Sequence, residues 1–506
     1  YKRQEGMSWG NVEVHIVIHQ HWDPAWAFQR RHMIPLLPKL FDDILDKLRR
    51  YPSYRFVLDG QTHILREYLD QLPSSTRRVK ELEISKYVKE GKLLIGPFYS
   101  QIDWNLTDGE VWIRNLLIGH KDAKKFGNIM KTGWLIDIFG FPGTVPKILK
   151  EFGINTVFFT RGLGVKRDEV KDMYIWKSVN GTEILAIYLI ESYRNAIRLS
   201  KYPELAEDRI KGELKALLPY SSTGKTILLL DGYENLPEAD DIVPVVDELN
   251  KRGIAKITIS TPENYVKSAL KYKPRLTKIY GYLYHGKYAT ALRGVFSSRI
   301  RLKQKYMEFE KYLIRYVEPL SCILWYLGNE YPEIIVTLWR KLLEVATHDE
   351  ICGCHIDDVY EDLMNTLNDV KTTCDKLLKE SLEKLAMYID TSWIENGIPI
   401  IVFNLSPWER DGVERILVEI PEDTDRFYIE DFEGNRIPIQ IGRRHGNKVE
   451  LWIKDKIPPL GYKVYKISQS IEKGALRSDL KIEDRVIENR YIRIRVNDNG
   501  LSLIHI

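Results

Sequence analysis

The chain has 506 residues, enough for about three domains of ordinary size. Hydrophobic residues make up 44% and charged residues 29%, which excludes a wholly disordered chain. A formal charge of +4 gives no electrostatic basis for binding nucleic acid or an anionic membrane. We find no apolar run long enough for a transmembrane helix and no visible signal peptide. Four cysteines are too few for a disulfide framework and fit a reducing compartment, so we expect a cytoplasmic protein.

The first 270 residues alternate short strand-like runs with helical patterns. The predicted strands are Val12–Ile18, Tyr54–Leu58, Leu93–Pro97, Thr132–Ile136, Thr156–Phe159, Thr226–Leu230 and Ala255–Ile259. Predicted helices between them include Leu36–Arg50, Glu110–Phe126 and Ile242–Arg252. This alternation predicts an α/β fold with parallel strands, either a closed barrel or an open doubly wound sheet. The stretch 176–190, with Asn180-Gly181 in its middle, predicts an inserted hairpin.

The period of the apolar residues changes twice in the rest of the chain. From about residue 296 to 385 it is helical, and about three helices fit, which predicts a small bundle. From about residue 398 the period becomes two, which predicts an all-β domain, for which we favour a sandwich. We therefore predict a multidomain α/β + α + β protein with domains over 1–270, 271–390, 391–475 and 476–506. The last is the start of a β domain, since the strand-like run 491–496 lies close to where the chain stops.

Polar side chains gather just beyond the first predicted strand. Because side chains alternate along an extended chain, His19, His21 and Asp23 share one face. The C-terminal ends of strands are where active sites form in α/β folds. Imidazole nitrogens and a carboxylate at this spacing can bind one metal ion, and such ligands suit zinc. The alternative is two hydrogen-bonded histidines in the core.

Two later segments carry further candidates. Asp137 lies at the tip of the fourth strand, and the helix beginning at Val145 starts too late for Asp137 to cap it. A functional carboxylate is therefore favoured there. His348-Asp349-Glu350 closes a predicted bundle helix before a tight Cys-Gly-Cys turn. A protonated histidine would also complement the helix dipole at that position, so this signal is weak by itself.

Other charged residues follow the remaining strands. Asp103 follows the third strand, Arg161 the fifth, and Asp231 and Glu234 the sixth. Carboxylates beside aromatic residues suit a carbohydrate, since aromatic faces take the apolar side of a sugar and carboxylates take its hydroxyls. Paired carboxylates also perform glycoside hydrolysis.

Five segments, in order along the chain, resemble those of glycoside hydrolase family 38, the zinc-dependent α-mannosidases. His19–Trp26 resembles the family's H-x-H-x-D-P-G-W signature, with Ala25 in place of the usual glycine, and Trp134–Gly140 resembles its W-x-I-D-x-F-G. Thr347–Cys354 is similar to its H-D-x-I-x-G segment and Phe296–Arg299 to its F-T/S-S-R segment. Asp103–Arg114 is similar to its D-x-N-L…G-E…R segment.

The resemblance implies a seven-stranded (β/α) barrel, a three-helix bundle and a β-sandwich, with more β-domain expected after residue 506. It implies a Zn²⁺ ion, with Co²⁺ as an alternative, and a site whose residues are the following. The metal ligands would be His21, Asp23, Asp137 and His348, and Asp137 would also be the nucleophile. Trp26 would lie against the sugar, Asp349 would bind its hydroxyls, and Arg161 would support the surroundings of the nucleophile. His19 belongs to the motif but is not a ligand in the family.

The implied activity is retaining hydrolysis of terminal α-mannosyl bonds through a covalent mannosyl-enzyme. The acid/base residue would be Glu234, whose offset from Gly232 matches the family pattern, with Asp231 as the alternative. The substrate would be an oligosaccharide or a small α-mannoside, and the oligomeric state stays open, with a homo-oligomer as one alternative. Two other functions are kept: a metal-dependent polysaccharide deacetylase, and a non-catalytic metal-containing mannoside-binding protein.

Overall fold

The computed structural model describes residues 9–236, 241–421, 426–469, 480–500 and 502–505. The chain forms two compact units. The first comprises residues 1–314 and 332–375, and the second comprises residues 315–331 and 376–506. All the residues singled out above for catalysis or metal binding belong to the first unit.

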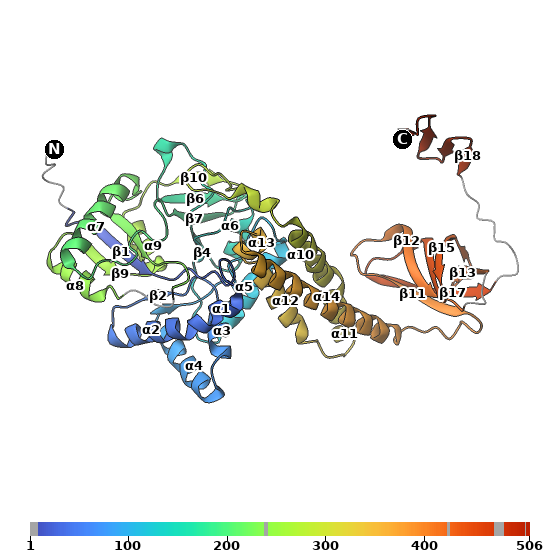
Figure 1. Ribbon diagram of the computed structural model, residues 1–506, viewed down its shortest axis with the longest axis horizontal. Coiled ribbons are helices and arrows are strands. Elements are labelled where there is room, and N and C mark those ends of the chain that lie inside the picture. The colour runs from blue at the N-terminus through green and yellow to red at the C-terminus, as the bar shows by residue number, and fades with distance from the viewer. Residues whose placement is uncertain (1–8, 237–240, 422–425, 470–479, 501, 506) are drawn as a thin grey trace. The chain divides into compact units, whose positions relative to one another are not determined.

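The strands of the first unit form three sheets (Figure 1). In the first sheet, β1 (Glu13–Ile18) lies between β8 (Thr226–Asp231) and β9 (Lys256–Ile259), and both pairings are parallel. The second sheet has the order β10-β6-β7-β5-β4. Its strands are β10 (Thr277–Tyr280), β6 (Met173–Lys177), β7 (Glu183–Tyr188), β5 (Thr156–Phe159) and β4 (Gly133–Leu135). The third sheet is the short pair β2 (Phe56–Val57) and β3 (Leu93–Leu94).

Every predicted strand of the first 270 residues is present, and the coarse prediction of a mixed α/β fold is confirmed. The expected hairpin is confirmed as the antiparallel pair β6 and β7, whose β7 also pairs in parallel with β5. The strand pairings among the described residues fall into three sheets rather than one closed ring. The seven-stranded barrel therefore stays a prediction.

An apolar cluster joins these sheets. It contains side chains from β1, β2, β4, β5, β7 and β8, and among them are Val17, Val57, Trp134, Phe158 and Ile187. Strands that are buried on both faces read as continuous apolar runs, which is why the sequence pattern located them. Their carboxyl ends are thereby held together around one centre.

Helices cover the strands from outside. In α2, the buried residues recur with helical spacing, as Leu37, Leu40, Phe41, Ile44 and Leu45, and pack with β1 in a second apolar cluster. The first unit contains α1 (Arg30–Met33), α2 (Leu37–Arg50), α3 (His63–Asp70), α4 (Ser74–Lys89), α5 (Gly109–Lys124), α6 (Val145–Glu151), α7 (Pro203–Leu217), α8 (Val243–Lys251), α9 (Pro262–Lys271), α10 (Ile300–Tyr312), α12 (Ile334–Val345) and α13 (His348–Cys352).

The segment expected to hold about three helices is more divided than predicted. A π-helical turn over Leu313–Val317 separates α10 from α11 (Glu318–Tyr326), and the short α13 precedes the long α14 (Asp357–Ala386). Gly353, with φ of 75°, ends α13 in a left-handed conformation that suits glycine. The three-helix bundle stays a prediction.

The second unit contains the region from about residue 398 that was predicted to be all-β. Two sheets, with orders β11-β17-β13-β14 and β12-β16-β15, share one apolar core that includes Ile429, Leu451 and Tyr465, the arrangement of a β-sandwich. These strands are β11 (Ile398–Asn404), β12 (Arg410–Glu419), β13 (Phe427–Asp431), β14 (Arg436–Ile437), β15 (Ile439–His445), β16 (Lys448–Ile457) and β17 (Gly461–Gln469). A further antiparallel sheet consists of β18 (Lys481–Glu483), β19 (Val486–Glu488), β20 (Arg493–Val496) and β21 (Ser502–His505). None of the helices in the described part of the chain is long and apolar enough to cross a bilayer.

Candidate active site

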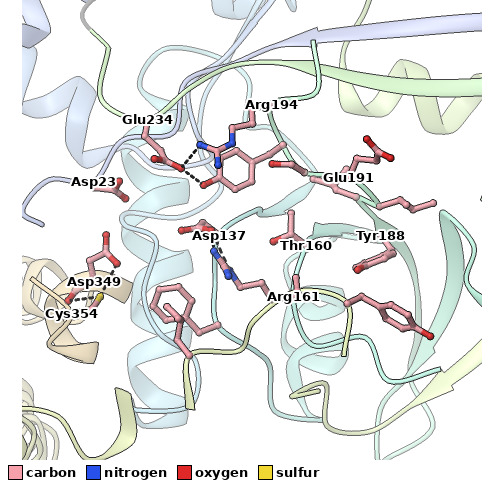
Figure 2. A pocket seen from close by; sticks show the side chains of 18 of the residues that line it. Asp23, Asp137, Thr160, Arg161, Tyr188, Glu191, Arg194, Glu234, Asp349 and Cys354 are labelled. Atoms are coloured by element: carbon pink, nitrogen blue, oxygen red, sulfur yellow. Dashed lines mark hydrogen bonds and ion pairs between the residues drawn. The ribbon is translucent and has the colours of Figure 1, made fainter. Parts of the chain in front are cut away.

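The predicted site residues converge at the carboxyl ends of the parallel strands. Asp23 follows β1, Asp137 follows β4, Arg161 follows β5 and Glu234 follows β8. They line one cavity of about 460 Å³, to which α13 adds Asp349. Figure 2 shows Asp23 and Asp349 on one side of Asp137, with Glu234 and Arg194 above it.

The four predicted metal ligands lie close together. His21 Nε2 is 2.9 Å from Asp23 Oδ1 and 3.9 Å from Asp137 Oδ2. His348 Nε2 is 3.5 Å from Asp23 Oδ1 and 3.8 Å from Asp137 Oδ2. Two overlapping groups of donor atoms could each hold an ion: His21, Asp137 and His348, and Asp23, His348 and Asp349.

Three atoms at the centre of this cluster make no hydrogen bond of good geometry among the described residues, although two of them lie 2.9 Å apart. They are His21 Nε2, Asp23 Oδ1 and His348 Nε2, and all are buried. The other ring nitrogen of each histidine faces an acceptor: His21 Nδ1 lies 3.1 Å from the Asp59 carboxylate and His348 Nδ1 lies 3.1 Å from the Gln101 carbonyl oxygen. A carboxylate and a carbonyl only accept, so each Nδ1 carries a proton and each Nε2 faces the cluster, where it would offer a lone pair to a bound metal ion.

The charge balance of the cluster also favours a cation. Burial lowers the pKa of His348, but the Asp349 and Asp23 carboxylates outweigh it and raise that pKa to about 10. Burial raises the pKa of the Asp349 carboxyl to about 7, against the opposing effect of His348. Buried polar atoms without partners are costly, and the carboxylates beside these atoms attract positive charge. Two imidazoles and two carboxylates therefore form a donor set that fits a divalent metal.

Asp137 faces two environments at once. Its Oδ1 accepts hydrogen bonds from Arg161 Nη2 at 2.5 Å and Nε at 3.2 Å, whereas its Oδ2 faces the histidines. Arg161 is itself held by the Thr290 carbonyl oxygen at 2.9 Å, and its guanidinium lies over the Phe139 ring. The dashed lines in Figure 2 mark this contact between Arg161 and Asp137. These contacts hold the Asp137 carboxylate in one orientation, with Oδ1 toward Arg161 and Oδ2 toward the histidines.

The cavity contains Glu234 but not Asp231. The Glu234 Oε1 atom accepts a hydrogen bond from the Tyr193 hydroxyl at 2.6 Å, and Arg194 Nη1 lies 3.6 Å away. Asp231 ends β8 opposite Ile18 and is almost fully buried, and it is not among the described residues that line the cavity. The position of the two side chains thus favours Glu234 over Asp231 for contact with a ligand.

The remaining predicted residues occupy distinct places. Trp26 lines the cavity with 37% of its surface exposed, and Asp349 Oδ1 accepts from the Cys354 thiol at 3.1 Å. His19 faces away from the donor groups and donates from Nε2 to the Tyr193 carbonyl oxygen at 2.7 Å. Burial lowers the pKa of His19 to about 4, so its ring is neutral.

The loop that carries Glu234 is bonded to the segment that carries the metal-ligand candidates. The His21 amide donates to the Tyr233 carbonyl oxygen at 3.1 Å and the Asn235 amide donates to the His21 carbonyl oxygen at 3.0 Å. The Asn235 side chain also accepts from the Asp23 amide at 2.8 Å. At Gly232, a Cβ atom would come within 2.4 Å of the His19 ring, so only glycine fits there.

Two other motif segments support α13. Asp103 accepts a hydrogen bond from the Cys352 thiol at 3.2 Å, and its amide donates to the Ala346 carbonyl oxygen at 2.9 Å. Ser298 and Lys303 both donate to the Cys352 carbonyl oxygen, at 2.5 and 3.0 Å. These residues do not enter the cavity; they fix the turn that presents His348 and Asp349.

The sequence analysis missed several residues of the site. Asp59, fully buried, accepts from His21, from the Trp22 amide at 2.9 Å and from Gln61 Nε2 at 2.7 Å. The Asp59-Gly60 pair reads as an ordinary turn, so its sequence signal was ambiguous. Tyr193 and Arg194 lie in irregular chain after β7, where no periodic pattern marks them.

Comparisons with known proteins agree with this geometry. A family model described as "Glycosyl hydrolases family 38 N-terminal domain" matches residues 11–291, and one described as "Alpha mannosidase middle domain" matches residues 290–385. A protein of Halalkalibacterium halodurans described as "Putative mannosylglycerate hydrolase" is 29% identical and covers 84% of this chain and 48% of its own length. "Alpha-mannosidase G" of Dictyostelium discoideum is 22% identical, with 97% of this chain and 46% of that protein covered.

Among solved structures, an alpha-mannosidase from Enterococcus faecalis V583 superposes with a TM-score of 0.85 at 25% identity. The match covers 97% of this chain and 60% of that one. The chain spans about half the length of the curated relatives it matches. The first family model covers more than half of the chain, and the five motif segments meet around one cavity or support it. The chain therefore belongs to glycoside hydrolase family 38.

Proposed function

We propose that this chain carries the active site of a retaining, metal-dependent exo-α-mannosidase that hydrolyses terminal α-mannosyl bonds. The observation that supports it most directly is the content of a single cavity. A carboxylate held by an arginine (Asp137), a carboxyl held by a tyrosine (Glu234) and a cluster of metal-ligand candidates all border that cavity. Relatives described as α-mannosidases share the family.

In the first step, Asp137 attacks the anomeric carbon while the bond from that carbon to the leaving-group oxygen breaks. Glu234 gives its proton to the departing oxygen, so the aglycone leaves as a neutral alcohol and the mannosyl group stays on Asp137. In the second step, Glu234 takes a proton from water, and the water oxygen attacks the anomeric carbon and releases Asp137. Arg161 orients Asp137 for this attack, because its guanidinium donates two hydrogen bonds to one carboxylate oxygen.

The residues that would hold the metal are His21, Asp23, Asp137 and His348, with Zn²⁺ as the ion and Co²⁺ as the alternative. When bound, such an ion supplies Lewis-acid binding and orientation of the sugar's hydroxyl groups. Asp59 and the Gln101 carbonyl oxygen hold the Nδ1 protons, which keeps both Nε2 lone pairs directed at the cluster.

Two further residues would bind the sugar. Trp26 lines the cavity, and an aromatic ring suits the apolar side of a mannose ring; the Asp349 carboxylate can accept hydrogen bonds from the hydroxyls of the sugar. The names of the relatives point to a small mannoside, mannosylglycerate, and to α-mannosides in general.

The test is hydrolysis of p-nitrophenyl α-mannoside by the full-length, metal-loaded protein, before and after chelation and after return of Zn²⁺ or Co²⁺. Activity should disappear with the chelator and return with metal. Asp137→Asn should lower turnover by at least about 10³-fold, as loss of a nucleophile does in other enzymes. A retaining reaction releases α-mannose first, which nuclear magnetic resonance of the fresh product detects.

Other outcomes would contradict the proposal. Release of β-mannose first would exclude the covalent intermediate. Release of acetate from an acetylated glycan, without mannoside hydrolysis, would favour the deacetylase. Binding of mannose by wild-type protein that hydrolyses neither substrate would favour a non-catalytic binding protein.

A further inference from the structure

The chain bends unusually in the segment that follows β7. Ser192 has a φ of 142°, in a region of backbone conformation that residues other than glycine rarely adopt. Such conformations cost free energy and persist only where the surrounding structure holds them. Ser192 lines the cavity, and the bend directs the next residue, Tyr193, into the same cavity wall.

Tyr193 is held from several sides. Its ring packs edge-on against the His21 ring, with centroids 5.6 Å apart, and against the His19 ring, with centroids 6.2 Å apart. Its carbonyl oxygen accepts from His19 Nε2 at 2.7 Å. Only 6% of the residue is exposed. The hydroxyl group therefore has little freedom to move, and it is bonded to Glu234.

Glu234 needs such a support because its own side chain is long and a quarter exposed. The structure gives its carboxylate two polar neighbours within the described residues, the Tyr193 hydroxyl at 2.6 Å and Arg194 at 3.6 Å. Arg194 is half exposed and lies beyond hydrogen-bonding distance, and Figure 2 shows it approaching Glu234 from the opposite direction to Asp137. The tyrosine is thus the partner with a fixed position.

We propose that Tyr193 is a positioning residue for the acid/base carboxyl of Glu234, an inference that rests on the proposed function. The hydroxyl donates to Oε1 and so leaves Oε2 to carry the proton that passes to the leaving-group oxygen. Tyr193 keeps its own proton in both steps, and no bond to it forms or breaks. Its hydrogen bond fixes the direction in which Glu234 gives and takes a proton.

The experiment compares Tyr193→Phe with wild type on two aryl α-mannosides, using the full-length, metal-loaded protein. The leaving groups are 2,4-dinitrophenol, which departs without protonation, and phenol, which needs it. Because general-acid assistance matters only for the poor leaving group, kcat/KM should fall about 10- to 100-fold for the phenyl mannoside and less than about threefold for the dinitrophenyl mannoside. The phenylalanine ring keeps the packing against His21, so metal content should equal that of wild type.

Glu234→Gln is measured in parallel and should show the same preference more strongly. The double variant should be no worse than Glu234→Gln alone, since Tyr193 acts through Glu234. Tyr188→Phe is the matched control, because it removes a hydroxyl from the same cavity without touching Glu234. Any loss that it causes should be equal for the two substrates.

The outcomes separate the two levels of the argument. If Glu234→Gln shows the leaving-group dependence but Tyr193→Phe lowers both substrates equally or loses metal, the positioning role is overturned. If Glu234→Gln itself shows no such dependence, the acid/base assignment fails instead. Should Tyr193→Phe not fold, Ser192→Gly still allows the bend but gives the backbone more freedom, so the hydroxyl is placed less firmly. It should raise the same leaving-group dependence in a weaker form, and equal effects on both substrates would again overturn the inference.

Discussion

The two ends of the cavity solve the problem of buried polar groups in different ways. At the end formed by His21, Asp23 and His348, three polar atoms converge without hydrogen-bond partners among the described residues. At the other end, the Glu234 carboxylate is bonded to a hydroxyl of the same chain. The first arrangement needs a charge from outside the polypeptide to be stable, whereas the second is complete within it. Under the proposed function, binding a cation and moving a proton would fall to separate side chains.

Burial differs in the same sense. His21 and His348 are at most 1% exposed, whereas a quarter of the Glu234 side chain is exposed. An unsatisfied group costs more when water cannot reach it. We call the side with His21, Asp23 and His348 the metal end and the side with Glu234 the acid/base end. We expect substitutions at the metal end to alter both stability and metal content, and substitutions at the acid/base end to alter chiefly the rate.

The largest effect should come from His348→Ala. His348 belongs to both groups of donor atoms that could hold an ion, so its loss removes a ligand from each. Since a metal clamp contributes several kcal/mol, activity on p-nitrophenyl α-mannoside should fall by about 10³-fold or more. Metal content, measured by mass spectrometry of the washed protein, should fall with it.

The matched control is His120→Ala, which removes a half-buried histidine of α5 from outside the cavity. It should leave metal content unchanged. Full metal occupancy in His348→Ala would contradict the ligand assignment and reduce the comparison of the two ends to a difference in packing.

Gly232→Ala should affect the acid/base end and spare the metal end. The new methyl group would meet the His19 ring, which is held by the Tyr193 carbonyl oxygen and cannot easily retreat. The loop that carries Glu234 should shift instead, and a displacement of about 1 Å can cost roughly 100-fold in kcat/KM. Metal content should stay at the wild-type value.

Gly212→Ala provides the comparison, because a Cβ atom at that helical position meets nothing within 4 Å. Kinetics of the control should match wild type. If Gly232→Ala lost metal before it lost rate, the backbone hydrogen bonds between this loop and His21 would transmit the shift to the metal ligands.

Asp59→Asn should weaken the metal end alone. The variant removes the charge that orients His21 through Nδ1, and loss of such an outer carboxylate commonly costs 10- to 100-fold in metal affinity. Isothermal titration of the metal-free protein with Zn²⁺ would measure it, and excess metal should restore most of the activity. Asp122→Asn, which breaks the buried pair with Arg340, should lower thermal stability without changing metal affinity. Equal affinities for Asp59→Asn and wild type would contradict the orienting role.

The smallest effect should come from a buried carboxyl group that lies outside the cluster of metal-ligand candidates. Burial raises the pKa of Glu310 from its ordinary 4.5 to about 7 in the folded chain, and the residue accepts from the Asp108 amide at 2.9 Å. The unfolded chain thus loses this proton at lower pH than the folded one, so stability falls as pH rises from about 4.5 through 7. Glu310→Gln can accept the same bond without ionising, and it should raise the unfolding temperature by about 3 °C above pH 7.5.

At pH 5 the variant and the wild type should have the same unfolding temperature, since Glu310 is then protonated in the folded chain. A stabilisation of equal size at both pH values would show that packing, not ionisation, separates the two proteins. Thermal unfolding followed by circular dichroism at the two pH values makes the measurement.

Apolar period located the candidate residues that follow strand ends, and the motif segments located Trp26, His348 and Asp349. His21, Asp23 and Asp137 follow apolar runs whose period is clear, and the parallel arrangement then brings their side chains together. Asp59 follows a two-residue strand and looks like a turn residue, although it is the partner of His21. Tyr193 lies in irregular chain, where placement depends on the Ser192 bend and on contacts with residues distant in sequence. A local sequence pattern therefore locates helices and strands. Supporting contacts made by irregular segments produce no such pattern and cannot be located in this way.

The helical segment shows the same limit. Its apolar period predicted helices, and α12 buries Leu338, Trp339 and Leu342 on one face as expected. The π-helical turn over Leu313–Val317 was not anticipated. Nor was the short α13, because the turn that ends it is held by Asp103, Ser298 and Lys303 through Cys352. Whether the strands close into a barrel likewise depends on pairing between sheets, which no local period encodes.

The backbone hydrogen bonds between His21 and the loop 233–235 restrict which segments can be exchanged between related proteins. More than 200 residues separate the two segments in sequence, yet each supplies the other's hydrogen-bond partners. Chain length can vary freely between them, but neither can shift by one residue without turning a metal-ligand candidate or Glu234 away from the cavity. In a chimaera with a distant relative, we expect the two segments to function only when they come from the same parent.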